Sequence, residues 1–180
     1  MSLDAQALRA RFRDDRCRHV VIPELVAAPI AAAMRAQVDD AGFAQIYEPD
    51  RGRYELNREL AAPELFEELR QLVAQLVERP VEVGPACWLR LRHRDYALIK
   101  GDATARAAAG KHVELTLDFS ARATGQGEIV YTDGGESWVV VQEPGSVAVV
   151  ERDAWLYRYD RYLDHRIGDA LIYRLRLALL

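Results

Sequence analysis

The chain has 180 residues, half of them apolar and 29 % charged, with a formal net charge of −4. These values are ordinary for a globular protein and leave no electrostatic argument for binding nucleic acid or an anionic membrane. No apolar run approaches the length of a transmembrane helix, and the polar N-terminus lacks the apolar core of a signal peptide. The two cysteines, Cys17 and Cys87, are too few for a disulfide framework. We expect a cytoplasmic protein with one domain over residues 1–180.

The first 84 residues predict helices with short strands between them. Apolar spacing indicates a short helix from Leu3 to Phe12, and Pro29 and Gly42 are suited to begin and end a second one. The clearest helix runs from Pro63 to about Glu78, because its apolar residues follow the helical period and Pro80 stops it. Two strands and a turn are expected around these helices, at 19–22, 43–47 and 49–53 respectively.

After Pro85 the apolar period changes to two, which is typical of strands. Glycine and proline turn signals separate the candidate strands, which are 86–92, 95–100, 111–119, 127–131, 137–142, 146–151, 154–159 and 170–178. This many short strands in succession indicates a sandwich, jelly roll or small barrel. We therefore predict an α+β fold: a double-stranded β-helix (jelly roll, cupin-like) over residues 85–180, with the helices of residues 1–84 packed on the outer face of one sheet.

Histidine spacing raises the first functional hypothesis. His93-Arg94-Asp95 is a His-x-Asp pattern, and His165 is available much later as a third ligand. Two imidazoles and one carboxylate, with coordination positions left open, bind Fe(II) in non-haem oxygenases. A three-residue pattern also arises easily by chance, so a turn between two strands is the alternative interpretation of residues 93–95.

Three later segments carry a family resemblance: Gly127-Glu128-Ile129, Pro144-Gly145-Ser146-Val147-Ala148-Val149, and His165-Arg166-Ile167 followed nine residues later by Arg174. Over roughly residues 18–180 the chain resembles the Fe(II)/2-oxoglutarate-dependent oxygenases, particularly the small prolyl 4-hydroxylase-like branch. In that family the late histidine is a metal ligand, and the arginine about nine residues later binds the distal carboxylate of 2-oxoglutarate. The resemblance therefore implies these roles for His165 and Arg174, whose guanidinium suits two-pronged carboxylate binding.

The first half of the family's metal motif is changed in this chain. The family's His-x-Asp follows a segment similar to Gly-Asp-Tyr-x-Leu-x, and Arg94-Asp95-Tyr96-Ala97-Leu98-Ile99 takes that place here. Lys100-Gly101-Asp102 is then the counterpart of the motif, which implies that Asp102 is a metal ligand and that Lys100 replaces the first histidine. In this register, which we favour, residues 93–95 are the hairpin turn. A lysine ligates a metal only when neutral, and neighbouring carboxylates favour its charged form.

A second departure lies on the predicted strand 111–119, where polar and apolar residues alternate. Its polar side carries His112, Glu114, Thr116 and Asp118. Inward-facing acids would repel a dicarboxylate, whereas outward-facing acids would belong to an ordinary half-exposed strand. Buried acids would need compensation, with Lys100 pairing with Asp102 or Glu114 and Arg174 pairing with Asp118. The candidate site residues are Lys100 and Glu114 for catalysis, Arg174 and Asp118 for the cosubstrate, and Asp102 and His165 for the metal.

Three functions follow from these patterns. The first is an oxygenase that uses Fe(II) and 2-oxoglutarate to hydroxylate a small molecule or a protein side chain, with Lys100, His93 or His112 completing the metal shell. The second is a degenerate member of that fold, which binds a ligand or catalyses a non-oxidative reaction in the same pocket. The third is an unrelated jelly-roll binding or scaffolding protein. We expect a small-molecule or peptide substrate, and the patterns indicate no particular oligomeric state.

Overall fold

The computed structural model describes residues 5–13, 16–98 and 110–180. Its three helices are α1 (Ala5–Arg13), α2 (Ala28–Ala41) and α3 (Pro63–Val77). Its strands are β1 (His19–Ile22), β2 (Ala44–Glu48), β3 (Gly52–Asn57), β4 (Val83–Leu91), β5 (Tyr96–Ala97), β6 (His112–Asp118), β7 (Ile129–Thr132), β8 (Ser137–Val140), β9 (Val147–Arg152), β10 (Tyr157–Asp160) and β11 (Ile172–Leu179). A 3₁₀ turn, η2 (His165–Ile167), precedes β11. None of the described helices combines the length and the apolar character needed to span a membrane.

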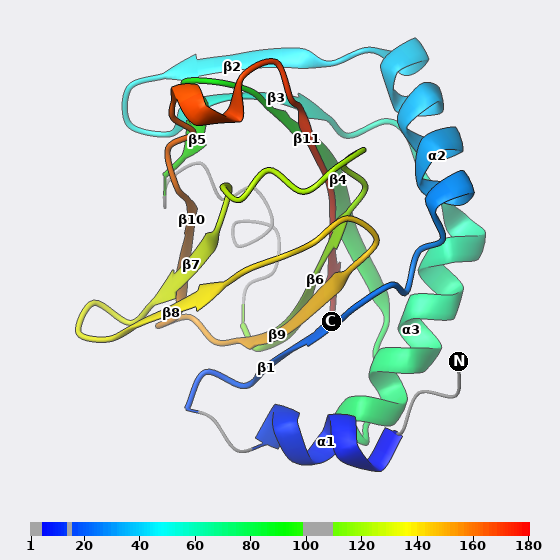
Figure 1. Cartoon of the computed structure of the whole chain (residues 1–180). Coiled ribbons are helices and arrows are strands. Elements are labelled where there is room, and N and C mark those ends of the chain that lie inside the picture. The colour runs from blue at the N-terminus through cyan, green and yellow to red at the C-terminus, as the bar shows by residue number, and fades with distance from the viewer. Residues whose placement is uncertain (1–4, 14–15, 99–109) are drawn as a thin grey trace.

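The strands form an antiparallel jelly roll, as predicted. Neighbours follow the order β1-β9-β6-β11-β4-β3-β5-β10-β7-β8, and β2 pairs with β3 at the side of this path. Figure 1 shows the sheet curling so that β6, β9 and β11 face β7 and β10 across a nearly closed barrel. The α+β double-stranded β-helix predicted from the change in period at Pro85 is therefore confirmed.

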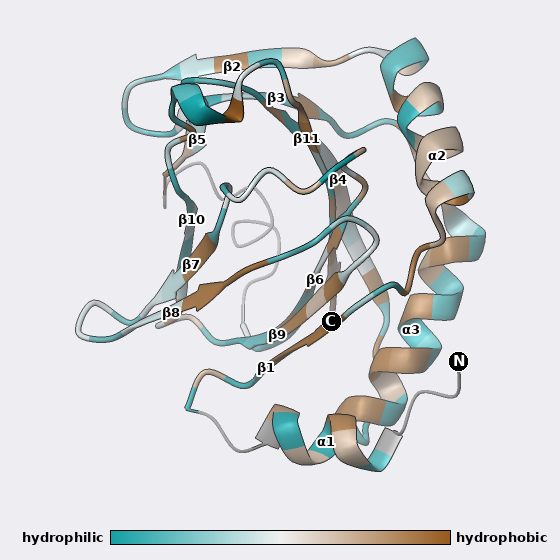
Figure 2. Ribbon diagram, viewed as in Figure 1, coloured by the Kyte–Doolittle hydropathy of each residue, from teal (hydrophilic) through white to brown (hydrophobic). Residues whose placement is uncertain are grey.

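The helices cover one wall of the barrel, also as predicted. α2 and α3 lie along the outer side of β4, β6 and β11, and α1 lies beside β1 (Figure 1). On α3 the residues Phe66, Leu69 and Val73 are buried, and they join one apolar cluster with Leu115 of β6 and Leu177 of β11. Figure 2 shows apolar segments alternating with hydrophilic ones along α3. Apolar burial of this kind contributes roughly 25 cal/mol per Å².

Local signals explain where the helices end. Pro29 lies in the first turn of α2, and Gly42 ends that helix with φ of 81° while its N–H donates to Val38 and Asp39. α3 starts at Pro63 and stops at Glu78, which adopts the left-handed conformation. Ile30 in the first turn of α2 is 54 % exposed, whereas Ala31 and Val38 of the same helix are buried.

The turn expected at residues 49–53 is shorter than predicted, because Gly52 already begins β3. Gly52 has φ of 132°, and a Cβ at this position would lie 2.4 Å from the carbonyl oxygen of Tyr96. Glycine is therefore required for the close approach of β3 to β5. The predicted turn therefore included Gly52 and Arg53, which are the first two residues of β3.

Candidate functional site

The interior of the barrel is lined by charged side chains from facing strands. All seven residues of β6 are buried, so the half-exposed alternative for this strand is wrong. Its apolar residues pack toward the helices, which leaves Glu114, Thr116 and Asp118 facing inward because successive side chains alternate. The neighbouring strand β11 alternates in the same way and directs Arg174 and Arg176 inward.

Glu114 lies at the centre of one interior cluster. Its carboxylate is 2.9 Å from Arg152 of β9 and 2.5 Å from Arg158 of β10, and it accepts a hydrogen bond of 2.7 Å from the Tyr131 hydroxyl. Burial opposes ionisation, but Arg158 and Arg152 outweigh this effect and hold the pKa of Glu114 well below its usual value. Burial and the Glu114 charge raise the pKa of Tyr131 well above its usual value, so this hydroxyl is a stable donor.

Asp160 lies at the centre of a second interior cluster. One of its oxygens, Oδ1, accepts a hydrogen bond of 2.8 Å from Nη1 of Arg174 and another from Nη2 of Arg176. Burial opposes ionisation of Asp160, yet Arg176 and Arg174 lower its pKa, so the carboxylate is charged. Burial lowers the pKa of Arg174, although Asp160 partly offsets this effect.

The backbone of Gly127 also holds Arg174, because its carbonyl oxygen accepts a hydrogen bond from Nη2 of the guanidinium. Gly127 has φ of 83°, and a Cβ there would lie 2.4 Å from Ile172 and 3.4 Å from Arg174. The expected pairing of Arg174 with Asp118 is replaced by the pair with Asp160. Asp118 faces Arg174 in the strand register, but its Oδ1 accepts the backbone N–H of Ser120 at 2.8 Å.

Five residues of the two interior clusters were not among the candidates chosen from the sequence: Tyr131, Arg152, Arg158, Asp160 and Arg176. Arg158 and Asp160 are two residues apart on β10 and both are buried, whereas Tyr157, the first residue of the same strand, is 46 % exposed. The alternation of β10 was therefore a usable signal that both charged residues point inward.

Of the three other predicted site residues, the structure describes only His165. Lys100 and Asp102 lie outside the described residues, so their roles stay predictions. His165 is exposed on η2, between the buried Leu163 and Ile167. Neither interior cluster includes His165 among its described contacts.

His112 is buried at the start of β6, on the inward-facing side of that strand. Its Nδ1 is 3.0 Å from the carbonyl oxygen of Gly110, which favours a proton on that nitrogen. Its Nε2 has no hydrogen-bond partner within the described part of the chain.

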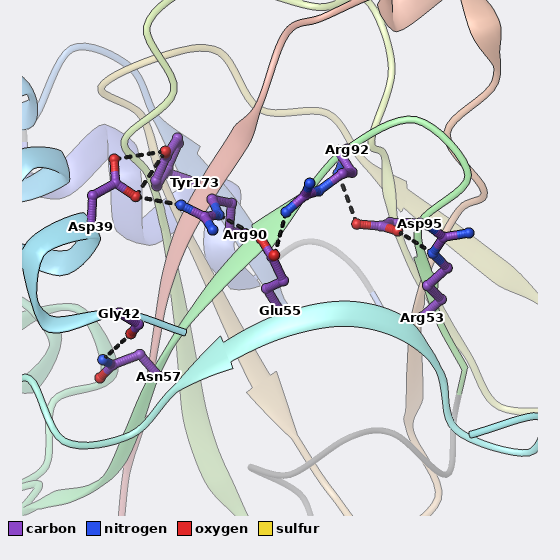
Figure 3. Close-up of polar contacts among 9 residues, drawn as sticks. All are labelled: Asp39, Gly42, Arg53, Glu55, Asn57, Arg90, Arg92, Asp95 and Tyr173. Atoms are coloured by element: carbon purple, nitrogen blue, oxygen red, sulfur yellow. Dashed lines mark hydrogen bonds and ion pairs between the residues drawn. The ribbon is translucent and has the colours of Figure 1, made fainter. Parts of the chain in front are cut away.

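Residues 93–95 form the turn between β4 and β5, as the favoured register predicted. The Asp95 carboxylate accepts the backbone N–H of Arg92 at 3.0 Å and pairs with Arg53 at 3.3 Å. Figure 3 shows this turn at the end of a row of polar contacts on the outside of the barrel, running from Asp39 through Arg90 and Glu55. Asp95 thus closes a turn, which gives the His-x-Asp pattern a structural explanation.

The described interior does not match the groups that the family resemblance implies. Within residues 5–13, 16–98 and 110–180, no three His, Cys, Asp or Glu side chains are grouped so that they could hold a metal ion. The guanidinium assigned to 2-oxoglutarate, that of Arg174, is engaged by Asp160 and Gly127. The described residues therefore do not fit 2-oxoglutarate as they stand, because a second carboxylate would have to displace Asp160.

Comparisons with known proteins support the fold. No protein-family model and no curated protein sequence matches the chain. Among solved structures, it is similar to an oxidoreductase of the 2OG-Fe(II) oxygenase family from Burkholderia pseudomallei, with a TM-score of 0.73 and 13 % identity over 97 % of this chain and 90 % of that one. A prolyl-4-hydroxylase from Pseudomonas putida gives a TM-score of 0.67 and 10 % identity over 96 % and 97 % of the two chains.

HygX from Streptomyces hygroscopicus, solved with nickel, 2-oxoglutarate and hygromycin B, gives a TM-score of 0.64 and 11 % identity over 99 % of this chain and 87 % of that one. At these identities the similarity establishes a shared fold, and function has to be argued from the site itself.

Proposed function

We propose that this chain is a divergent member of the Fe(II)/2-oxoglutarate oxygenase superfamily, in its prolyl 4-hydroxylase-like branch, that binds a small-molecule or peptide ligand without the usual iron and 2-oxoglutarate chemistry. The shared fold supports the evolutionary part of this proposal. One observation carries the functional part: Arg174, the residue expected to bind the cosubstrate, is buried in an ion pair with Asp160.

The energy needed to break that ion pair argues against a dicarboxylate replacing Asp160 at Arg174. Breaking a buried pair by withdrawing one partner costs about 3–5 kcal/mol, because a charge is left in a medium of low dielectric. An incoming dicarboxylate would also approach Glu114 and Asp118, which are both buried inside the barrel. The interior therefore disfavours 2-oxoglutarate through competition and through repulsion.

We extend the proposal to the metal position. Asp102 and His165 are the ligands that the resemblance implies, and we propose that the Lys100 ammonium pairs with Asp102 and repels a divalent cation. The exposed position of His165 on η2 is consistent with this view. Cys17 and Cys87 are buried and take part in no disulfide within the described residues, which is compatible with the reducing cytoplasm that we propose as the location of this one-domain protein.

The test is an anaerobic calorimetric titration of the wild type with Mn(II) or Fe(II), with and without 2-oxoglutarate, followed by an aerobic assay for succinate. We expect weak metal binding, no binding of 2-oxoglutarate and no succinate. Lys100→His should strengthen metal binding, because it supplies the missing imidazole. Stoichiometric metal binding and succinate formation by the wild type, both lost in His165→Ala, would overturn the proposal.

That contrary result would establish the second candidate function, an oxygenase that hydroxylates a small molecule or a protein side chain. The shared fold favours it, since the similar structures include a 2-oxoglutarate complex of a viral collagen prolyl hydroxylase. In that case Asp102 and His165 would hold the iron, which supplies the oxidising chemistry, and Arg174 would have to exchange Asp160 for the cosubstrate.

A further inference from the structure

The chain supplies its own carboxylate to two interior guanidinium groups. Arg174 and Arg176 project from the same face of β11, and Asp160 reaches them from β10 in the opposite wall. We infer that Arg174 and Arg176 form a carboxylate-binding site that Asp160 occupies from within the chain, and that a small monocarboxylate can take its place when that side chain is removed. This inference rests on the proposed function, because it explains why an external carboxylate is excluded.

The arrangement has the chemistry of a ligand site. Two guanidinium groups from alternate positions of one strand converge on a single oxygen, Oδ1 of Asp160, and all three side chains are 1 % exposed. The other carboxylate oxygen, Oδ2, is buried and has no hydrogen-bond partner within the described residues. Buried carboxylates usually have both oxygens satisfied. Asp160 therefore uses only part of the hydrogen-bonding capacity of this site.

One of the two guanidinium groups, that of Arg174, is also held independently of Asp160, which prepares the site for another ligand. The carbonyl oxygen of Gly127 accepts a hydrogen bond from Arg174, and the lack of space for a Cβ keeps this backbone close. Thr116 faces Arg176 in the strand register, and its buried hydroxyl has no hydrogen-bond partner among the described residues. An acetate in the space left by Asp160 would thus meet two buried guanidinium groups, one of them held by the backbone, and pre-organised groups of this kind lower the entropy cost of binding.

Covalent attachment explains why the wild type would ignore external carboxylates. A side chain tethered inside the barrel competes at an effective concentration in the millimolar range or above, without loss of translational freedom. Asp118 offers a matched comparison, because it is also buried and faces Arg174, but it accepts a backbone N–H from Ser120. Removal of Asp118 leaves Arg174 and Arg176 occupied by Asp160.

The experiment compares wild type, Asp160→Ala, Asp160→Asn and Asp118→Ala by thermal unfolding in EDTA at constant ionic strength, with formate, acetate, acetamide or chloride as the probe. We expect Asp160→Ala to unfold at a lower temperature than wild type and to recover part of the loss in acetate or formate. The recovery should saturate in the millimolar range, as binding to the folded state requires. Acetamide and chloride should give no saturable effect.

The other proteins serve as controls, and the refolded yield is a second measurement. Asp160→Asn retains the volume of the side chain and should not respond, and neither should wild type or Asp118→Ala. If Asp160→Ala does not fold in chloride, acetate should raise its refolded yield, since a ligand of the native state shifts the equilibrium. An equal response of Asp160→Ala to acetate and chloride, in both unfolding and refolding, would overturn the inference alone. Tight binding of 2-oxoglutarate by the wild type would instead overturn the proposed function.

Discussion

The two faces of β6 differ completely in chemistry although they are equally buried. Leu115 and Glu114 are adjacent and both are 0 % exposed, but Leu115 packs beneath the helices and Glu114 pairs with arginines across the barrel. The apolar face is stabilised by non-directional burial, which tolerates many partners of suitable size. The charged face depends on particular partners, because a buried charge without one is very unfavourable. The difference shows that burial alone does not locate the core of this molecule.

The largest effect is expected from breaking the charged face. Glu114→Ala removes the carboxylate shared by Arg152 and Arg158, and we expect a loss of about 3–5 kcal/mol in the free energy of unfolding. Chemical unfolding in urea measures this change. Glu114→Gln is the matched control, because it keeps the shape and can still accept from Tyr131. A loss below about 1 kcal/mol in Glu114→Ala would mean that the pairing is energetically neutral.

The apolar face should be nearly as sensitive, for a different reason. Leu115→Ala leaves a cavity beneath α3, and such substitutions cost about 2–5 kcal/mol. Val139→Ala is the control on an exposed position, 43 % accessible, where the change should stay within about 0.5 kcal/mol. The same urea series gives both values. Equal losses at the two positions would contradict the assignment of the helix-covered face as core.

The apolar face could be predicted from the sequence because its signals are local. The helical period of α3 and the two-residue period of β6 each identify the apolar side of their own element, and the apolar sides of a helix and a sheet must pack against another element. Pro63 and Gly42 likewise mark helix ends through backbone preferences that need no distant partner. These elements therefore appear with nearly the predicted bounds.

The charged face could be predicted only in part, because its partners are distant in the chain. Alternation places Glu114 and Arg174 on inward-facing positions, but it does not say which of many arginines and acids they meet. Arg152 lies 38 residues from Glu114, and Asp160 lies 14 residues from Arg174 across the barrel. The pairing of Arg174 with Asp118, which was expected because buried acids need compensation, is replaced by a pair with Asp160 from the opposite wall.

Acid should separate the two faces. The pKa of Glu114 is lower in the folded protein than its unfolded value of about 4.3, so its stabilising effect is fully present above that pH and is lost as the pH falls through the folded pKa. Asp160 behaves in the same direction. Unfolded carboxylates titrate roughly between pH 5 and pH 3. Over that range the free energy of unfolding should fall in parallel for wild type and Leu115→Ala, and it should fall less for Glu114→Gln. Identical slopes in all three proteins would contradict a charged Glu114.

The smallest effect is expected on the outer side of β11, where Tyr173 shows what a polar contact contributes when water can replace it. The Tyr173 hydroxyl donates to both oxygens of Asp39, at 3.0 and 2.9 Å, and Asp39 also pairs with Arg90 (Figure 3). The Asp39 side chain is 40 % exposed, so water can solvate the carboxylate once the hydroxyl is gone. Tyr173→Phe should therefore lower the free energy of unfolding by only about 0.5–1.5 kcal/mol, the net worth of an ordinary hydrogen bond. A double-mutant cycle with Asp39→Asn in urea isolates the contact from the packing of the ring. Coupling comparable with the loss in Glu114→Ala would show that outer and inner polar contacts are energetically alike, and that solvent access is not what distinguishes them.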